Sequence, residues 1–198
     1  MLTLDFFTQN TLTVAQSLLG KTLVRILNGT RLSGVVVETE AYFGSTDSAS
    51  HAFKGQTSRN AAMFGPPGYS YIYLIYGLHT MLNVVTEPVT QPAAILIRAI
   101  EPQEGLTTMR LNRGKQRQNL IPKNLTNGPG KLCQALAIDR HLNRWDLTQG
   151  SELWFEDAQL SPNVQIACGP RVGIGYATIV DQQAPWRFWL KNNAYVSK

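Results

Sequence analysis

Cysteine is scarce in this chain of 198 residues, which contains only Cys133 and Cys168. The two lie 35 positions apart, and neither belongs to a group with the spacing of zinc ligands. Proteins that depend on disulfides usually carry several closely spaced cysteines. The sequence therefore predicts neither a disulfide framework nor a zinc knuckle. It favours a reducing compartment, which is the cytoplasm with its nucleoid in a bacterium and the nucleus in a eukaryote.

Long hydrophobic runs are also missing. Apolar runs such as Ala93–Ile97 are short, whereas a membrane-spanning helix needs about 20 apolar residues. Residues Met1–Asp5 lack the basic start and apolar stretch of a secretory signal. With 43% hydrophobic residues, the chain is long enough to bury one sizeable core. We expect a single soluble domain over residues 1–198, without a membrane partner.

Two common signatures of nucleotide and metal chemistry are absent. Gly173-Ile-Gly175 lacks the third glycine of a dinucleotide-binding fingerprint, because Thr178 stands in its place. The three histidines of the chain show no metal-like spacing. We therefore expect neither a cofactor nor a metal.

Acidic residues are missing from one long stretch. The chain has 18 Lys and Arg against 13 Asp and Glu, a net charge of +5, yet residues 105–138 contain no acid. That stretch carries six bases: Arg110, Arg113, Lys115, Arg117, Lys123 and Lys131. Such a local positive field attracts a polyanion through counterion release. The alternative is that these bases form the solvated face of a helix and a loop.

The apolar pattern predicts short elements without regular alternation of strands and helices. Strands are expected at residues 21–27, 31–39, 69–76, 81–86, 94–100, 153–155, 164–167, 171–174 and 187–190, and helices at residues 11–19, 105–113 and 130–138. Asn28-Gly29 suits a tight hairpin turn, and residues 44–68 form a long polar loop. This order predicts a single-domain α+β fold: a mainly antiparallel curved sheet with flanking short helices and a protruding hairpin.

Acidic side chains alternate along Val35-Val-Val-Glu-Thr-Glu-Ala-Tyr42. Because alternate side chains of a strand share a face, Glu38, Glu40 and Tyr42 are expected on one side of the sheet. A sheet holds a carboxylate rigidly, which suits a general base that activates a water. The alternative is that both acids face solvent.

Tyrosines crowd the strand that follows the long loop. Tyr69, Tyr71 and Tyr73 share one face, whereas Tyr76 has the opposite parity and stands beside the turning Gly77. A ring on the sheet can stack on a base, and a ring at a hairpin tip can wedge into a base step. Aromatic residues are also common in strands, so ordinary core packing is the alternative.

An arginine and a lysine occupy positions that favour an anion. Arg98 interrupts an apolar strand, where it needs a carboxylate or phosphate, unless its face is exposed and it pairs with Glu101 or water. Asn127-Gly-Pro-Gly-Lys131 opens an expected helix, whose free amides and lysine suit a phosphate. Gly-Pro is also common before helices in general.

Together these segments resemble the alkyladenine (3-methyladenine or methylpurine) DNA glycosylase family, the base-excision repair enzymes that remove alkylated purines. The matching motifs are Glu38-Thr-Glu-Ala-Tyr42, His51, Arg59-Asn60 with Met63-Phe64, Tyr71-Ile-Tyr-Leu-Ile-Tyr-Gly77, Asn83, Leu96-Ile-Arg-Ala-Ile-Glu-Pro102, Gly128-Pro-Gly-Lys-Leu-Cys-Gln-Ala-Leu136, Arg171-Val-Gly-Ile-Gly175, Arg187-Phe188 and Tyr195-Val-Ser197. The chain departs from the family at Ala61-Ala62, where members often read Arg-Gly.

The resemblance implies a catalytic role for three residues. Glu40 would be the general base that activates the water attacking C1′ of the damaged nucleotide. Arg98 and the main-chain carbonyl of Val172 would hold that water. Direct attack by water would leave an abasic site, without a covalent imine or strand cleavage, and would require no metal. Alkylation at N3 or N7 makes the purine a cationic leaving group, so little acid catalysis is needed.

It also implies how DNA would be bound. Tyr42 and Tyr73 would sandwich the extruded base, with His51 lining the pocket and its amide donating to the purine 6-position. Asn83 would reject normal guanine, and Tyr76 would fill the gap in the duplex. The expected partner is double-stranded DNA with damaged purines, bound by a monomer. Separately from the resemblance, the local positive charge and the helix start favour Lys131, Arg110, Arg113, Lys115 and Arg117 as contacts to DNA phosphates.

Two other classes of function stay open. A metal-dependent nuclease could use Glu38, Glu40 and His51 as ligands. A non-catalytic protein that binds damaged or single-stranded nucleic acid could use the same tyrosines and the basic stretch.

Overall fold

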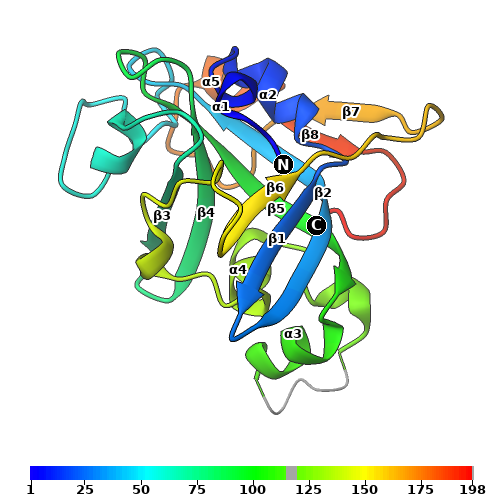
Figure 1. Cartoon of the computed structure of the whole chain (residues 1–198). Helices are drawn as coiled ribbons and strands as arrows, with labels where there is room; N and C mark the ends of the chain where they lie inside the picture. Colours follow the sequence, from blue (N-terminus) through cyan, green and yellow to red (C-terminus); the bar gives the residue numbers. More distant parts are fainter. Residues whose placement is uncertain (115–119, 198) are drawn as a thin grey trace.

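A long strand, β2 (Thr30–Tyr42), runs through the middle of the computed structural model, which describes residues 1–114 and 120–197 (Figure 1). One edge of β2 pairs first with β1 (Thr22–Leu27) and then with β8 (Arg187–Leu190), and its other edge pairs with β5 (Ala93–Glu104). Two strands continue the sheet beyond β5, first β4 (His79–Thr86) and then β3 (Ser70–Ile75), and β6 (Leu153–Glu156) follows β1. β7 (Ile166–Gly169) pairs with β8, and each of these pairings is antiparallel.

β5 is nearly as long as β2, and the remaining elements are shorter. The other strands are β1 (Thr22–Leu27), β3 (Ser70–Ile75), β4 (His79–Thr86), β5 (Ala93–Glu104), β6 (Leu153–Glu156), β7 (Ile166–Gly169) and β8 (Arg187–Leu190). The helices are α1 (Leu4–Phe7), α2 (Thr11–Ser17), α3 (Leu106–Asn112), α4 (Pro129–Ala135) and α5 (Ile179–Gln183), with 3-10 turns η1 (Ala61–Phe64), η3 (Pro122–Asn124) and η4 (Arg140–Leu142). The predicted α+β fold with a curved antiparallel sheet and flanking short helices is confirmed.

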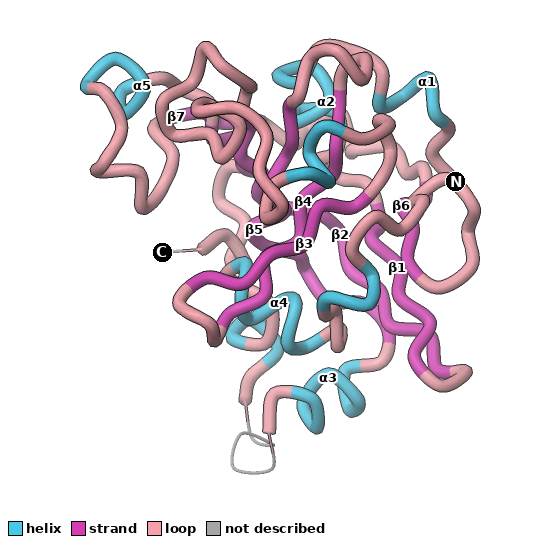
Figure 2. The backbone as a smooth tube through the Cα atoms, turned by 90° about the vertical axis from the view of Figure 1, so that its left-hand side faces the viewer, coloured by secondary structure: helices cyan, strands magenta, loops and turns pink. Residues whose placement is uncertain are grey.

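Both predicted hairpins form, and local backbone chemistry explains their turns. Asn28 and Gly29 join β1 to β2 with φ values of 49° and 77°, in the left-handed region that Asn and Gly tolerate best. Tyr76 and Gly77 join β3 to β4 with φ values of 51° and 69°. The β3–β4 hairpin carries its turn away from the rest of the sheet (Figure 2).

The two faces of the sheet have different roles. One face packs into the main hydrophobic core, to which α2 contributes Val14 and Ala15 and α4 contributes Leu132 and Cys133. The other face lies under the loop of residues 44–68 and the loop that leads into α5, which pack on it through two smaller hydrophobic clusters. Since the main core occupies the first side, polar side chains on the opposite side of the central strands can face a cavity.

One predicted strand is wrong. The apolar pattern predicts a strand at residues 171–174, but they form a loop between β7 and α5. The strand expected at residues 164–167 lies two residues later, as β7. Within the described residues, no helix is long and apolar enough to cross a membrane.

Candidate active site

A cavity of about 630 Å³ opens on the face of the sheet opposite the core. Its sheet-borne lining follows directly from strand register, because residues paired across neighbouring strands point to the same face. Tyr71 pairs with Asn83, Asn83 with Leu96, and Leu96 with Glu40. This cross-strand row connects the tyrosine strand to the carboxylate strand, so two motifs separated in sequence lie on one surface.

Glu40 lies at the end of this row and is fully buried, with 0% of its surface exposed. The Tyr42 hydroxyl donates to its Oε2 over 2.8 Å, and the Val172 amide donates to its Oε1 over 2.7 Å. The Arg98 guanidinium lies 3.3 Å from the same Oε1. These three partners of Glu40 line the cavity, so its carboxylate lies directly behind the cavity wall.

Glu38 is equally buried but has different partners. Its Oε1 accepts from Arg98 Nε over 2.9 Å and from the Ser197 hydroxyl over 2.9 Å, and its Oε2 accepts from the Ser197 amide over 2.7 Å. Arg187 Nε lies 2.8 Å from Oε1, close enough for an ion pair but without the alignment of a hydrogen bond. With so many donors around it, Glu38 anchors Arg98 and is unsuited to be the base.

Both solvent-facing alternatives from the sequence are wrong. Glu38 and Glu40 do not face water, and Arg98, which is 6% exposed, does not pair with Glu101. Burial opposes the charge of Arg98, but the charges of Glu40 and Glu38 more than offset this loss of solvation, so the pKa of Arg98 is raised. Two carboxylates thus hold one permanent cation at the cavity.

A pair of β-bulges brings this cluster together. Val36 pairs with Ile100 and Glu38 with Ala99, which leaves Val37 unpaired on β2. The next pair joins Thr39 to Ile97, which leaves Arg98 as the extra residue on β5. Bulges redirect side chains and are common beside active sites. The strand prediction contained no bulge, although it gave the correct common side for the two acids and Tyr42.

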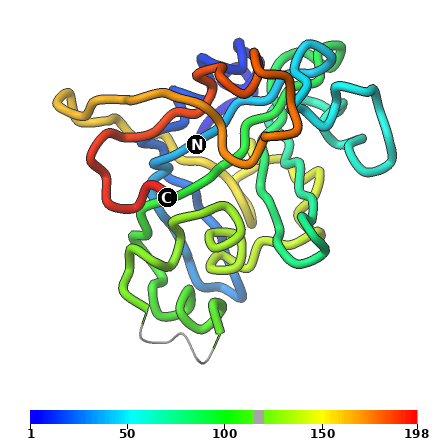
Figure 3. The backbone as a smooth tube through the Cα atoms, turned by 180° about the vertical axis from the view of Figure 1, so that it is seen from behind, coloured from blue at the N-terminus to red at the C-terminus, as the bar shows by residue number. Residues whose placement is uncertain are grey.

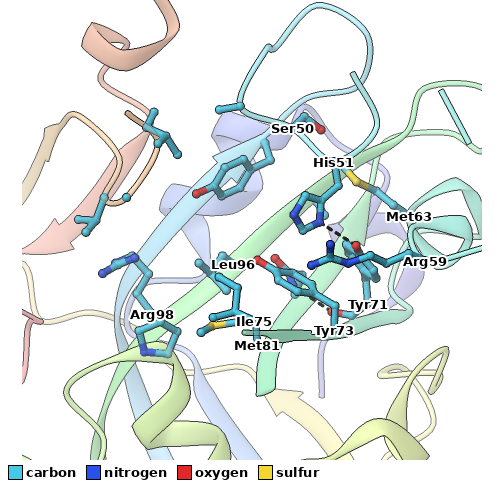
Figure 4. Close-up of a pocket in the computed structure, with 18 of the residues that line it drawn as sticks. Ser50, His51, Arg59, Met63, Tyr71, Tyr73, Ile75, Met81, Leu96 and Arg98 are labelled. Atoms are coloured by element: carbon cyan, nitrogen blue, oxygen red, sulfur yellow. Dashed lines mark hydrogen bonds between the residues drawn. The ribbon is translucent and has the colours of Figure 1, made fainter. Parts of the chain in front are cut away.

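Aromatic rings form the walls of the cavity. The His51 ring meets the Tyr73 ring edge-on, with centroids 4.5 Å apart, and His51 Nδ1 hydrogen-bonds to the Tyr71 hydroxyl over 2.8 Å. In Figure 4, His51 and Arg59 point toward the two tyrosines, while Arg98 lies at the opposite end of the cavity. The Arg59 guanidinium lies 5.7 Å from the Tyr73 ring centre. The flat surfaces suit a planar ligand.

Burial sets the protonation of these groups. It raises the pKa of Tyr71 to about 12, and it raises the pKa of Tyr73 further with help from the neighbouring Tyr71. It also raises the pKa of Tyr42, with a further contribution from the Glu40 charge, so the Tyr42 hydroxyl keeps the proton that it donates. Burial and the charge of Arg59 lower the pKa of His51, which is therefore neutral near pH 7.

A buried ion pair joins the two loops over the cavity. Arg171 makes two hydrogen bonds to Asp47, of 2.6 and 2.8 Å, and both side chains are fully buried. The Arg171 guanidinium also lies between the rings of Tyr42 and Trp186, 4.6 and 4.8 Å from their centres. Asp47 was missed by sequence reasoning, because a single acid in a polar loop gives no periodic signal.

The remaining candidates lie in the cavity and at its rim. Asn83 is buried, lines the cavity and donates from Nδ2 to the Tyr71 carbonyl over 3.0 Å. Tyr76 is 90% exposed at the hairpin tip and lies at the rim of the cavity. Tyr69, by contrast, does not line the cavity, since it pairs with Asp146 on another part of the surface.

The basic candidates differ in accessibility. Lys131 is exposed in the first turn of α4, and its Nζ bonds to the Asn127 side chain over 3.0 Å. Arg110 donates to the Leu120 carbonyl over 3.2 Å. Arg113 is only 6% exposed and donates to Gln134. Its burial differs from the exposed position expected of a residue that contacts DNA phosphates. Lys115 and Arg117 lie outside the described residues.

The ligand set proposed for a nuclease is not brought together. Arg98 lies between the carboxylates of Glu38 and Glu40, and His51 is bonded to Tyr71. Within residues 1–114 and 120–197, no group of three or more His, Cys, Asp and Glu side chains could hold a metal ion.

Comparisons with known proteins identify the family of this chain. The sequence profile of the methylpurine-DNA glycosylase family matches residues 5–194. A protein of Methanocella arvoryzae is 50% identical over 194 residues, which cover 98% of this chain and 94% of that protein. Proteins of Bacillus cytotoxicus and Desulfitobacterium hafniense are each 46% identical, over 98% of this chain and 97% and 96% of theirs. All three carry the provisional name 3-methyladenine DNA glycosylase.

Proposed function

Because this chain belongs to the methylpurine-DNA glycosylase family, we propose that it extrudes alkylated or deaminated purines from duplex DNA and hydrolyses their N-glycosidic bond. The products are the free base and an abasic site. The observation that carries this proposal is the buried Glu40 carboxylate, held by Arg98 behind a cavity with aromatic walls. An enzyme must take a base out of the stack to reach its glycosidic bond, and flat rings give that base a place to bind.

The chemical step needs one water and one base. Glu40 takes a proton from the water, whose oxygen forms a bond to C1′ while the bond from C1′ to the purine nitrogen breaks. The electron pair of that bond leaves with the purine. Arg98 and the main-chain carbonyl of Val172 hold the water, and the negative charge of Glu40 stabilises the oxocarbenium-like transition state. The contact between Glu40 and the Val172 amide supports this role, since it fixes the Val172 backbone beside the carboxylate.

Recognition of the purine rests on the cavity walls. Tyr42 and Tyr73 stack on its two faces, and the hydrogen bond between His51 and Tyr71 fixes the ring of His51 beside it. Asn83 is held by the Tyr71 carbonyl and excludes the guanine amino group from the purine edge. The backbone amide of His51 donates to an acceptor at the 6-position, where adenine instead presents a donor. This mismatch discriminates against normal adenine.

For alkylated purines, the leaving group explains why so little further machinery is needed. A purine alkylated at N3 or N7 is already cationic, so its bond to the sugar is weakened before it binds. Water attacks C1′ directly, so the enzyme forms no covalent imine and is monofunctional. It acts as a monomer, with Tyr76 filling the gap in the duplex and Lys131 and Arg110 near DNA phosphates.

The proposal is tested with duplexes that each carry one lesion: 3-methyladenine, 7-methylguanine, hypoxanthine or ethenoadenine. Purified protein is incubated with each duplex in the presence of a chelator, and free base and abasic sites are measured. Release of free base with an intact backbone supports the proposal. A chelator-sensitive cut in the backbone would instead identify a nuclease, and tight binding without base release would identify a non-catalytic reader.

A further inference from the structure

Ser197 closes a ring of hydrogen bonds with Glu38 and Arg98. Its hydroxyl donates to Glu38 Oε1 over 2.9 Å and accepts from Nη2, a terminal nitrogen of Arg98, over 3.0 Å. Its backbone amide donates to Glu38 Oε2 over 2.7 Å. The ring is completed by the bond of 2.9 Å from Arg98 Nε to Glu38 Oε1. All three residues are buried.

We propose that Ser197 is a positioning residue, which acts with Glu38 to fix the guanidinium of Arg98 against Glu40. This inference rests on the proposed function, in which Glu40 and Arg98 hold the attacking water. Ser197 itself does not line the cavity, so its effect on the reaction passes through Arg98.

The geometry of the guanidinium explains how a distant hydroxyl controls the catalytic end. The group is planar and rigid, so two fixed nitrogens determine the position of the third. Glu38 holds Nε and Ser197 holds Nη2. The remaining nitrogen, Nη1, is the one that lies 3.3 Å from Glu40 Oε1. Without the hydroxyl, the guanidinium can turn about its hydrogen bond to Glu38 and move Nη1 relative to Glu40.

The C-terminal segment that carries Ser197, residues 193–197, is itself anchored to the sheet. Asn193 donates from Nδ2 to Glu101 over 2.8 Å, and its Oδ1 accepts from the Tyr195 amide over 2.9 Å. Glu101 belongs to β5, three residues after Arg98. Tyr195 and Val196 pack against the main core. Figure 3 shows this red segment ending beside the green strand β5, and such anchoring holds Ser197 at a fixed distance from Arg98.

The experiment compares Ser197→Ala with a matched control. Ser33→Ala also removes a buried hydroxyl that donates to a carboxylate, that of Glu104, over 2.9 Å, but it does not touch Arg98. Single-turnover base release and the Kd for lesion DNA are measured for both variants. We expect Ser197→Ala to release base roughly 10- to 100-fold more slowly with Kd changed less than about threefold, because small misplacements of a reacting group are costly in rate. Ser33→Ala should release base at the wild-type rate.

A conservative variant and a spectroscopic measurement complete the test. Ser197→Thr keeps the hydroxyl and should recover most of the lost rate. The Nε–H signal of Arg98, measured by NMR in the free protein, should shift and exchange faster with solvent in Ser197→Ala but not in Ser33→Ala. The NMR measurement requires no turnover. It therefore tests whether Ser197 positions Arg98 even if the wild-type protein releases no base and the proposed function fails. An unchanged Arg98 signal, or equal rate losses in the two alanine variants, would overturn the inference.

Discussion

The carboxylate end of the cavity and the tip of the β3–β4 hairpin are built in opposite ways. At the carboxylate end, Glu38, Glu40 and Arg98 are buried and joined by direct contacts. At the tip, Tyr76 is 90% exposed and the adjoining Leu78 is 79% exposed. A buried carboxylate with fixed partners is arranged for a chemical step, whereas an exposed ring can only contribute when another molecule covers it. The first region should govern rate and the second should govern binding.

The sharpest test of this division is Glu40→Gln. The amide has nearly the same shape but cannot accept a proton from water, so base release should fall by about 10²- to 10⁴-fold. Lesion binding should change only a few-fold, because the aromatic walls are untouched. Single-turnover kinetics and a binding titration measure the two effects. A variant that releases base at the wild-type rate would show that Glu40 is not the base.

The ion pair between Asp47 and Arg171, which joins the two loops over the cavity, can be broken without changing a residue of the sheet. Asp47→Asn leaves Arg171 as a buried charge with no carboxylate partner, and breaking such a pair typically costs about 3–5 kcal/mol of unfolding free energy. Denaturant unfolding measures the loss. The control is Glu152→Gln, which breaks the partly exposed pair with Arg25 and should have a much smaller effect, since water screens that pair. Similar losses for both variants would contradict a structural role for the Asp47 pair.

The hairpin tip is tested by Tyr76→Ser. Loss of a stacking ring removes about 1–3 kcal/mol, so affinity for lesion DNA should fall roughly 5- to 150-fold. Binding to undamaged duplex should fall much less, because its base stack has no gap to fill. Competition binding on the two duplexes gives the ratio. An equal loss on both would exclude Tyr76 as the wedge.

The smallest effect is expected on the basic surface. Lys131→Gln should reduce the slope of log affinity against log salt by about one, if its ammonium meets one DNA phosphate. Base release from saturated complexes should stay unchanged, since Lys131 lies outside the catalytic cavity. Binding measured at four or five salt concentrations gives the slope, and a slope equal to that of the wild type would remove Lys131 from the interface.

Sequence patterns identified some of these features more readily than others. Alternation on one strand correctly predicted that Glu38, Glu40 and Tyr42 share a side, and the turn chemistry at Gly77 correctly predicted an exposed Tyr76. The apolar pattern failed at residues 171–174, where it predicted a strand and the chain forms a loop. Here Arg171 is held by Asp47, over 100 positions earlier in the chain. A local pattern contains no information about such a partner.

By itself, the sequence determined the local elements, the shared face of the acids and the family to which the chain belongs, because strand periodicity, turn preferences and ordered motifs are properties of neighbouring residues. Only the tertiary structure decided which acid anchors Arg98 and which one faces Val172. That choice depends on two β-bulges and on contacts from Ser197 and Val172, both more than 130 positions away from the two acids. Burial then gives these contacts their strength, since charges removed from water must find their partners within the protein.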